Sequence, residues 1–93
     1  MDIESIRHKA LKRLVEKGET KGLMEVERLV DMLNYLDQAS GPDELKIPPN
    51  FGFHALTGAR KGTYAMTVTK NWRLTFTMPN EDAVADLDLE DYP

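Results

Sequence analysis

Hydrophobic side chains in the first 40 residues recur three or four positions apart, in two separate runs. The first run consists of Ile6, Ala10, Leu11, Leu14 and Val15. The second run consists of Val26, Leu29, Val30, Leu33 and Leu36. This spacing puts each set on one face of a helix, so the pattern predicts two amphipathic helices. Gly18 is expected to end the first helix, and Gly41 is expected to form a left-handed cap after the second.

Beyond residue 51 the hydrophobic period shortens from about 3.6 residues to about 2, as it does where helices give way to strands. Apolar and polar residues alternate over 64–68 and again over 72–76. Facing the apolar side chains toward each other pairs Val68 with Trp72, Met66 with Leu74 and Tyr64 with Phe76. That register leaves residues 69–71 as a three-residue hairpin loop, in which Asn71 is expected to be left-handed.

A last strand follows a predicted connection over residues 79–82. Its apolar positions are expected to pair Ala85 with Phe76, Leu87 with Leu74 and Leu89 with Trp72. Arg73 then lies opposite Asp88. A further strand is expected over residues 51–56, and residues 2–5 are compatible with a short one.

The order of these elements predicts an α+β fold in one domain, residues 1–93. Two N-terminal helices pack on one face of a C-terminal antiparallel sheet of about four strands. No uninterrupted apolar run exceeds three residues, which excludes a membrane-spanning helix and the apolar stretch of a secretory signal. The expected compartment is the cytoplasm, with no membrane partner.

The residue types present limit the chemistry that is available. The chain has no cysteine, so disulfides, thiolate catalysis and cysteine-bound zinc are excluded. Its two histidines, His8 and His54, do not make a metal site without several carboxylates, so no metal and no cofactor is predicted.

Charge is distributed unevenly along the chain. Twelve basic and sixteen acidic residues give a formal net charge of -4, which argues against general nucleic-acid binding. Residues 45–80 nevertheless carry five basic residues and no acidic one, and the first predicted helix is also basic. A polyanion can be held locally by such patches. Each patch taken alone is better explained as an ordinary solvated surface.

The face of the sheet away from the helices is the candidate site. It is expected to carry Thr67, Arg73, Thr75, Asp86 and Asp88. His54 lies on the preceding strand, and Asp91 and Tyr92 follow the last strand, whose end falls beside the start of the Arg73 strand.

An arginine, a histidine, a carboxylate and a tyrosine in one place suit metal-free cleavage of RNA. The arginine binds phosphate, the tyrosine stacks on a base, and the histidine or carboxylate moves the proton of a ribose hydroxyl. The structural alternatives are an ordinary cross-strand pair of Arg73 with Asp88, a polar strand position for His54 and an edge position for Tyr92.

Several short segments, in order and spacing, resemble the HigB toxins of the RelE superfamily. These segments are Lys17-Gly18, His54-Ala55-Leu56, Gly58, Gly62, the strand 64–69, the run 71–76 and the ending Glu90-Asp91-Tyr92. The resemblance covers nearly the whole chain. It implies a RelE-like fold and a bacterial type II toxin, an endoribonuclease that cuts mRNA on the translating 70S ribosome without a metal. It also implies neutralisation by a HigA-type antitoxin, a helix-turn-helix protein through which operator DNA is bound.

The resemblance also implies roles for particular residues. His54 and Asp91 would serve proton transfer and orient the ribose hydroxyl, Arg73 would stabilise the charge on phosphorus, and Tyr92 would stack on or orient the substrate. The basic residues expected to contact RNA of the ribosome are Lys9, Lys12, Arg13, Arg60, Lys61 and Lys70.

Two positions depart from the family pattern. Thr57 stands where the family usually has a lysine, and Pro93 stands where it usually has a histidine. Losing a cation that stabilises the transition state costs about a hundredfold in rate, unless Arg60 or Lys61 reaches back to replace it. The alternative function is therefore a catalytically impaired homologue that binds the antitoxin and acts as a co-repressor. A third alternative is a small α+β domain of unrelated purpose.

Overall fold

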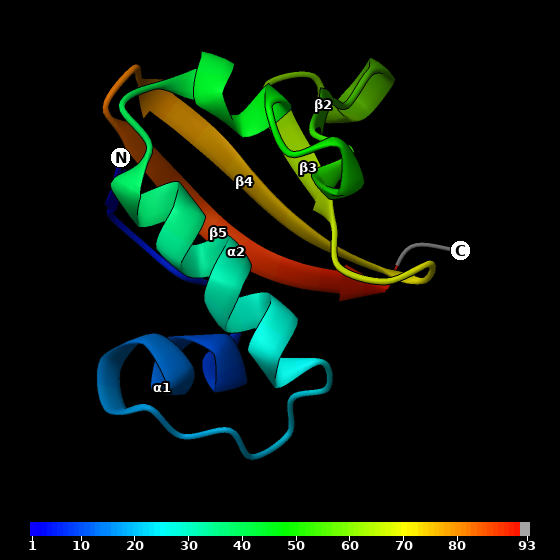
Figure 1. The fold of residues 1–93 in the computed structure, drawn as a ribbon. Coiled ribbons are helices and arrows are strands. Elements are labelled where there is room, and N and C mark those ends of the chain that lie inside the picture. Colours follow the sequence, from blue (N-terminus) through cyan, green and yellow to red (C-terminus); the bar gives the residue numbers. More distant parts are fainter. Residues whose placement is uncertain (92–93) are drawn as a thin grey trace.

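A computed structural model describes residues 1–91 as two helices packed against one sheet (Figure 1). The helices are α1 (Lys9–Lys17) and α2 (Val26–Gln38). The strands are β1 (Asp2–Ile3), β2 (His54–Ala55), β3 (Thr63–Thr67), β4 (Trp72–Asn80) and β5 (Ala83–Asp91). Short 3-10 turns occupy Pro42–Lys46, Pro49–Phe51 and Gly58–Arg60. The predicted α+β class is confirmed, including the short N-terminal strand.

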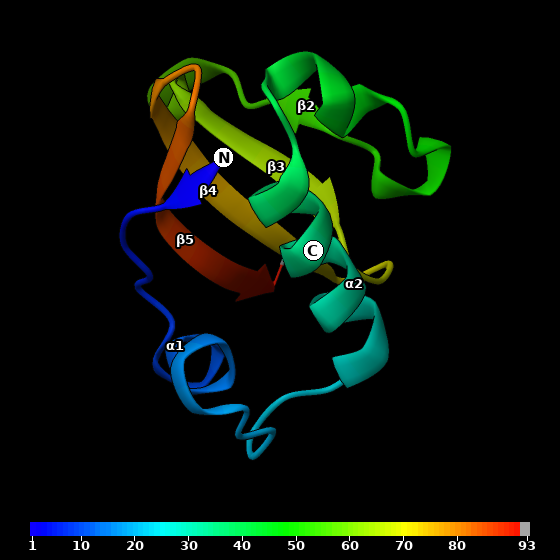
Figure 2. The same cartoon turned by 60° about the vertical axis from the view of Figure 1, so that its left-hand side comes forward.

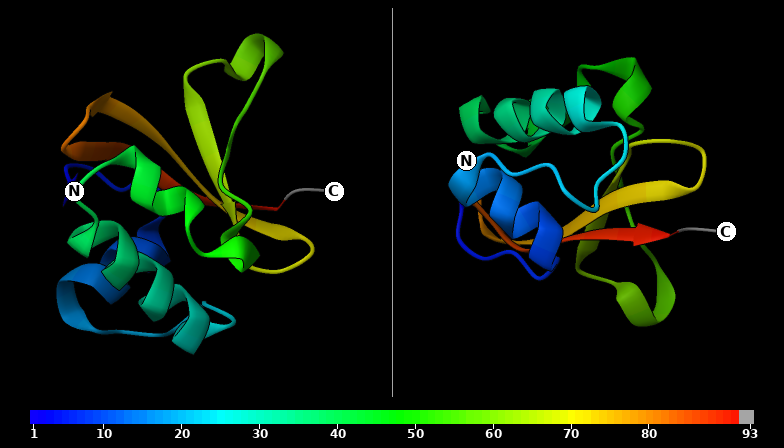
Figure 3. Two further views of the ribbon diagram at one scale, coloured as in Figure 1. Left: turned by 45° about the horizontal axis from the view of Figure 1, so that its top comes forward. Right: turned by 90° about the horizontal axis from the view of Figure 1, so that it is seen from below.

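The sheet has five strands in the order β1-β5-β4-β3-β2. Neighbouring strands are antiparallel except for β1, which runs parallel to β5 and lies beside it (Figure 2). Both helices lie on one side of the sheet, and the loop that contains Gly58–Arg60 lies on the other (Figure 3). Between the helices and the sheet is the core, to which Leu11, Leu29, Met32, Leu74 and Phe76 contribute fully buried side chains. Within residues 1–91, no helix is long and apolar enough to cross a membrane.

The two helices end differently. Gly18 ends α1, as predicted; its conformation is left-handed, and its N–H donates to the carbonyl of Leu14 at 2.9 Å. The predicted left-handed cap of α2 is wrong, because Gly41 is extended at φ 175° and the helix ends before an extended Ala39.

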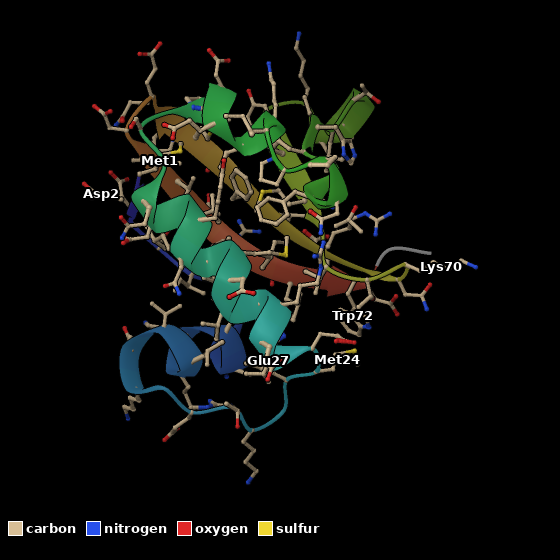
Figure 4. All side chains as sticks on the ribbon, viewed as in Figure 1. Met1, Asp2, Met24, Glu27, Lys70 and Trp72 are labelled. Carbon is tan, nitrogen blue, oxygen red and sulfur yellow. The ribbon has the colours of Figure 1, made fainter. Side chains whose placement is uncertain are left out.

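A long-range contact replaces the glycine cap of α2. The N-terminal ammonium group of Met1 donates to the carbonyl oxygens of Leu36, Asp37 and Ala39, at 3.2, 2.9 and 2.6 Å. Met1 lies at the C-terminal end of α2 in Figure 4. A positive charge with three donors suits the partial negative charge and orphan carbonyls of a helix C-terminus, so no left-handed residue is needed there.

The β3–β4 hairpin has the predicted register, with Tyr64 opposite Phe76 and Met66 opposite Leu74. Asn71, however, is not left-handed, because Glu25 and Asp86 are the only non-glycine residues with positive φ in the described part of the chain. The backbone N–H groups of Val68 and Thr69 both donate to the carbonyl oxygen of Trp72. This pairing closes the loop without a left-handed residue.

The predicted register of β4 and β5 is wrong by two residues. Arg73 lies opposite Glu90 rather than Asp88, and Leu74 lies opposite Leu89. The connection is a tight turn at residues 81–82 between Asn80 and Ala83, one position later than expected, and moving the centre of a turn by one residue moves the register by two. This shift keeps residues 87–91 on their predicted faces, whereas Ala85 lies opposite Thr77 on the open face rather than opposite Phe76, and Val84 is buried in its place.

The β4–β5 hairpin also contains an irregularity, which lies at Asp86 of β5. The register changes between Thr75 and Thr77 of β4, where Asp86 of β5 has a φ of 52°. Asp86 N–H donates at 2.8 Å to the hydroxyl of Ser5, in the segment that follows β1. The bulge therefore fits β5 to the N-terminal segment.

The strand expected over residues 51–56 is limited to His54 and Ala55. Phe51 is buried in the turn Pro49–Phe51, and Gly52 follows it with a left-handed φ of 56°. Pro48 and Pro49 have no backbone N–H, so this segment cannot pair like a strand before the turn at Gly52.

Candidate active site

The face of the sheet away from the helices is polar, as predicted. A small hollow of about 70 Å³ opens on it. Its lining consists of Arg7, Arg60, Thr63, Thr75, Phe76, Thr77, Asp86, Asp88 and Glu90. Two arginines and three carboxylates therefore share this hollow, and an ion pair of 3.7 Å joins Arg7 to Asp86.

Glu90 accepts hydrogen bonds from two neighbouring side chains on this face. The Arg60 guanidinium donates to both of its carboxylate oxygens, from Nη1 to Oε1 and from Nη2 to Oε2, each at 2.7 Å. Thr75, which is 1% exposed, donates its hydroxyl to Oε2. The bonds from Arg60 lower the pKa of the Glu90 carboxyl. The bond from Thr75 and the positive charges of Arg60 and Arg7 lower it further, and together these effects outweigh partial burial, which raises it.

Sequence reasoning did not select Glu90 as a site residue. It treated this position as part of an acidic C-terminal segment and of the family-like ending. The correct register of β4 and β5 identifies Glu90, because a turn centred one residue later places Glu90 directly opposite Arg73.

His54 is exposed at the start of β2, and its ring lies against the preceding turn. Nδ1 lies 2.8 Å from the carbonyl oxygen of Gly52. A carbonyl oxygen can only accept, so Nδ1 carries the proton and Nε2 of the neutral ring holds a lone pair. His54 lines a hollow of about 320 Å³ together with Thr57 and Arg60.

Arg73 lies near the start of β4, where its Nη1 donates to the carbonyl oxygens of Thr69 at 3.0 Å and Lys70 at 3.3 Å. It therefore holds the hairpin loop that follows β3. The register puts Arg73 opposite Thr67, while His54 is opposite Ala65 on the other edge of β3. His54 and Arg73 thus belong to the same face, two strands apart across the sheet and two residues apart along it, which is about 12 Å between their backbones.

Asp91 does not join them on this face. It is exposed and lies opposite Trp72, whose position belongs to the helix-covered side of the sheet. The side chains of Arg73 and Asp91 are expected to meet in one site. The register instead places Glu90 directly opposite Arg73 and Asp91 opposite the neighbouring Trp72. The predicted residues Tyr92 and Pro93 lie outside the described part of the chain.

The basic residues predicted to contact RNA fall into two regions. Lys9, Lys12 and Arg13 are exposed on α1, on the helix side of the sheet. Lys70 extends away from the molecule at the tip of the β3–β4 hairpin (Figure 4), and Lys61 is exposed after the turn Gly58–Arg60. Arg60 differs from these residues, because its guanidinium is bound to Glu90.

The described residues contain no group of three or more histidine, aspartate and glutamate side chains placed to hold a metal ion.

The fold is that of solved structures of YafQ. The chain has the fold of YafQ from E. coli strain BL21(DE3), with a TM-score of 0.64 and 17% identity over 97% of this chain and 91% of that chain. A single-residue variant of YafQ gives a TM-score of 0.65 and 19% identity with the same coverage.

The sequence then specifies the family within this class. Residues 4–92 match the family described as the RelE-like toxin of the type II toxin-antitoxin system HigB. The Endoribonuclease HigB of Proteus vulgaris is 42% identical over 92 residues, which cover 97% of this chain and 98% of that protein. The chain belongs to the HigB family of type II toxins, which confirms the resemblance noted in the sequence.

Proposed function

We propose that this toxin is an endoribonuclease that cleaves mRNA on the translating ribosome and does so without a metal. The observation that carries the proposal is the 42% identity, over nearly the full length of both chains, to a protein named Endoribonuclease HigB. The placement of His54 and Arg73 on one open face supports it, because these residue types suit cleavage of a phosphodiester.

The chemistry requires a base beside a phosphate. Because Nδ1 of His54 donates to Gly52, Nε2 is the atom that accepts the proton of a ribose 2′-hydroxyl. The 2′-oxygen then attacks the adjacent phosphorus to form a 2′,3′-cyclic phosphate, the bond to the 5′-oxygen of the next nucleotide breaks, and that oxygen takes a proton from water and leaves as a hydroxyl. Arg73 stabilises the negative charge that builds on the phosphate oxygens. Asp91 and Tyr92 keep the proton-transfer and stacking roles that the family resemblance implies.

The partners follow from the family and from charge. A toxin of a type II system has an antitoxin, and we propose that it is a HigA-type helix-turn-helix protein through which the pair binds operator DNA. The ribosome delivers the message, so a chain with a net charge of -4 needs only local basic patches. The toxin acts in the cytoplasm, where translation takes place.

Primer extension on a translated message, after induced expression, tests this function. The wild-type protein should arrest growth and produce new 5′ ends within the message. Arg73→Ala should remove both effects, whereas Lys21→Ala, a change at an exposed residue between the two helices, should keep both. An intact message in cells that accumulate folded wild-type protein would refute the endoribonuclease.

A second function is favoured by one feature of the site. Thr57 supplies no cation to the hollow that contains His54, and the cation nearest in sequence, Arg60, is paired with Glu90. A catalytically impaired toxin homologue would keep its antitoxin and act as a co-repressor. In that case the message stays intact, while the purified chain still binds the antitoxin and raises its affinity for operator DNA.

A further inference from the structure

Arg60 connects the two hollows of the open face. It lines the hollow that contains His54, and it also lines the smaller hollow that contains Glu90 and Thr75. No other residue of the described chain belongs to both of these linings. His54 also lines a separate hollow of about 390 Å³ whose lining lacks Arg60, so a group bound beside His54 meets the Arg60 side chain in the hollow that His54 shares with Thr57.

The guanidinium of Arg60 is fixed at both of its terminal nitrogens. Two parallel bonds of 2.7 Å to one carboxylate set the plane of the guanidinium as well as its position. The Arg60 side chain is 45% exposed, whereas that of Glu90 is 25% exposed. The carboxylate is thus the inner partner, and the arginine is the one that solvent and a ligand reach.

The Glu90 carboxylate is in turn held by a buried side chain of the sheet, that of Thr75. The hydroxyl that Thr75 donates to Glu90 belongs to a side chain that is almost fully buried in the central strand β4. The backbone of the Arg60 loop is also closed, because Lys61 N–H donates to the carbonyl of Gly58 at 3.1 Å and Leu56 N–H to that of Thr63 at 2.9 Å. The result is a chain of contacts from the core of the sheet through the carboxylate to an arginine at the surface.

We propose that Glu90, supported by Thr75, is a positioning residue that fixes the guanidinium of Arg60 for contact with the phosphate of the RNA beside His54. This inference rests on the proposed endoribonuclease function and adds a residue to its site. An arginine that is oriented before the substrate arrives loses less side-chain freedom on binding, and it is already in place when charge develops on the phosphate. An ordinary surface ion pair would need neither the buried threonine nor a place at the boundary of two hollows.

A double-mutant cycle tests this coupling with wild-type chain, Glu90→Gln, Arg60→Ala and the double variant. The measured quantity is the rate of mRNA cleavage on purified translating ribosomes, at saturating and at limiting ribosome concentration. Glu90→Gln should lower the maximal rate about tenfold, and Arg60→Ala about a hundredfold, with little change in half-saturation. The double variant should be no slower than Arg60→Ala, because the carboxylate acts only through the arginine.

Two further variants separate positioning from general damage. Glu27→Gln makes the same chemical change at an exposed residue of α2, on the helix side of the sheet, and it should cleave at the wild-type rate. Thr75→Val removes only the hydroxyl bond to Glu90 and should slow cleavage about threefold, which keeps the test valid if Glu90→Gln folds poorly.

The outcomes are distinct. If wild-type chain cleaves and Glu90→Gln cleaves equally fast, the positioning role is wrong while the endoribonuclease stands. If the double variant is slower than Arg60→Ala by the full factor seen for Glu90→Gln alone, Glu90 acts independently of Arg60 and the proposal is overturned. If wild-type chain does not cleave at all, the proposed function fails and this role fails with it.

Discussion

Single side chains on the open face were the hardest part of this molecule to predict. His54 and Arg73 were selected from the sequence, and the structure puts them on one face. Glu90 was missed and Asp88 was expected opposite Arg73, because alternation along a strand places residues opposite each other only once the register is known. The register depends on a turn without glycine, at Glu81 and Asp82, which leaves few local signals.

At this scale the Arg60–Glu90 pair predicts how stability depends on pH. The pKa of Glu90 is lowered in the folded chain, mainly by its bonds to Arg60, so the unfolded chain binds a proton more readily. The pair therefore contributes stability above the ordinary pKa of 4.5 and loses it as the pH falls through the lower folded value. Urea unfolding between pH 7 and pH 3 should show a steeper acid loss in wild-type chain than in Glu90→Gln. Parallel curves for the two proteins would contradict this.

Among the elements, those predicted correctly are the ones whose signals are local. The period of apolar residues marks both helices, and Gly18 marks the end of α1. The β3–β4 register follows from pairing like faces around a short loop. The errors come from contacts between distant segments: the Met1 ammonium replaces a glycine at the end of α2, and the segment after β1 bonds the bulge at Asp86. The spacing of apolar residues along the sequence does not indicate such contacts.

The side chain of Arg28 joins helix α2 to the sheet. Arg28 donates from Nε to the carbonyl of Val68 at 2.7 Å, and from Nη2 to those of Asn50 and Thr67, each at 2.8 Å. Its guanidinium also lies 5.8 Å from the centre of the Phe51 ring. Arg28 therefore connects α2 to the end of β3 and to the segment that leads to β2.

Removing this connection should destabilise the fold. Arg28→Met keeps the length of the side chain but leaves three carbonyl groups without their donor, so the free energy of unfolding should fall by about 3 kcal/mol. Arg28→Lys, which keeps the charge and fewer donors, should lose less. Urea unfolding measures both changes, and equal stability of Arg28→Met and wild type would show that water replaces the arginine without cost.

For the whole molecule, the two basic regions lie on opposite sides of the sheet. The basic residues of α1 are on the helix side, and Lys61 follows the turn on the open side. A substrate on the open face therefore leaves α1 available for a second contact with a large polyanion such as the ribosome.

The role of α1 is tested by reversing its charge. Changing Lys9, Lys12 and Arg13 to glutamate should weaken cosedimentation with ribosomes about tenfold or more, with a lower dependence on salt, because phosphate contacts are lost. All three side chains are exposed, so the far-UV circular dichroism should be unchanged. Sedimentation equal to that of wild type at every salt concentration would remove α1 from the ribosome contact.

The ammonium of Met1 has a practical consequence for handling this protein. An affinity tag joined before Met1 turns three donors and a positive charge into a single amide N–H, and thermal unfolding should then occur several degrees lower than in the untagged chain. A tag after β5 would instead crowd the end of the strand that carries Glu90. The exposed connection at residues 19–22 is the place where an inserted tag disturbs neither.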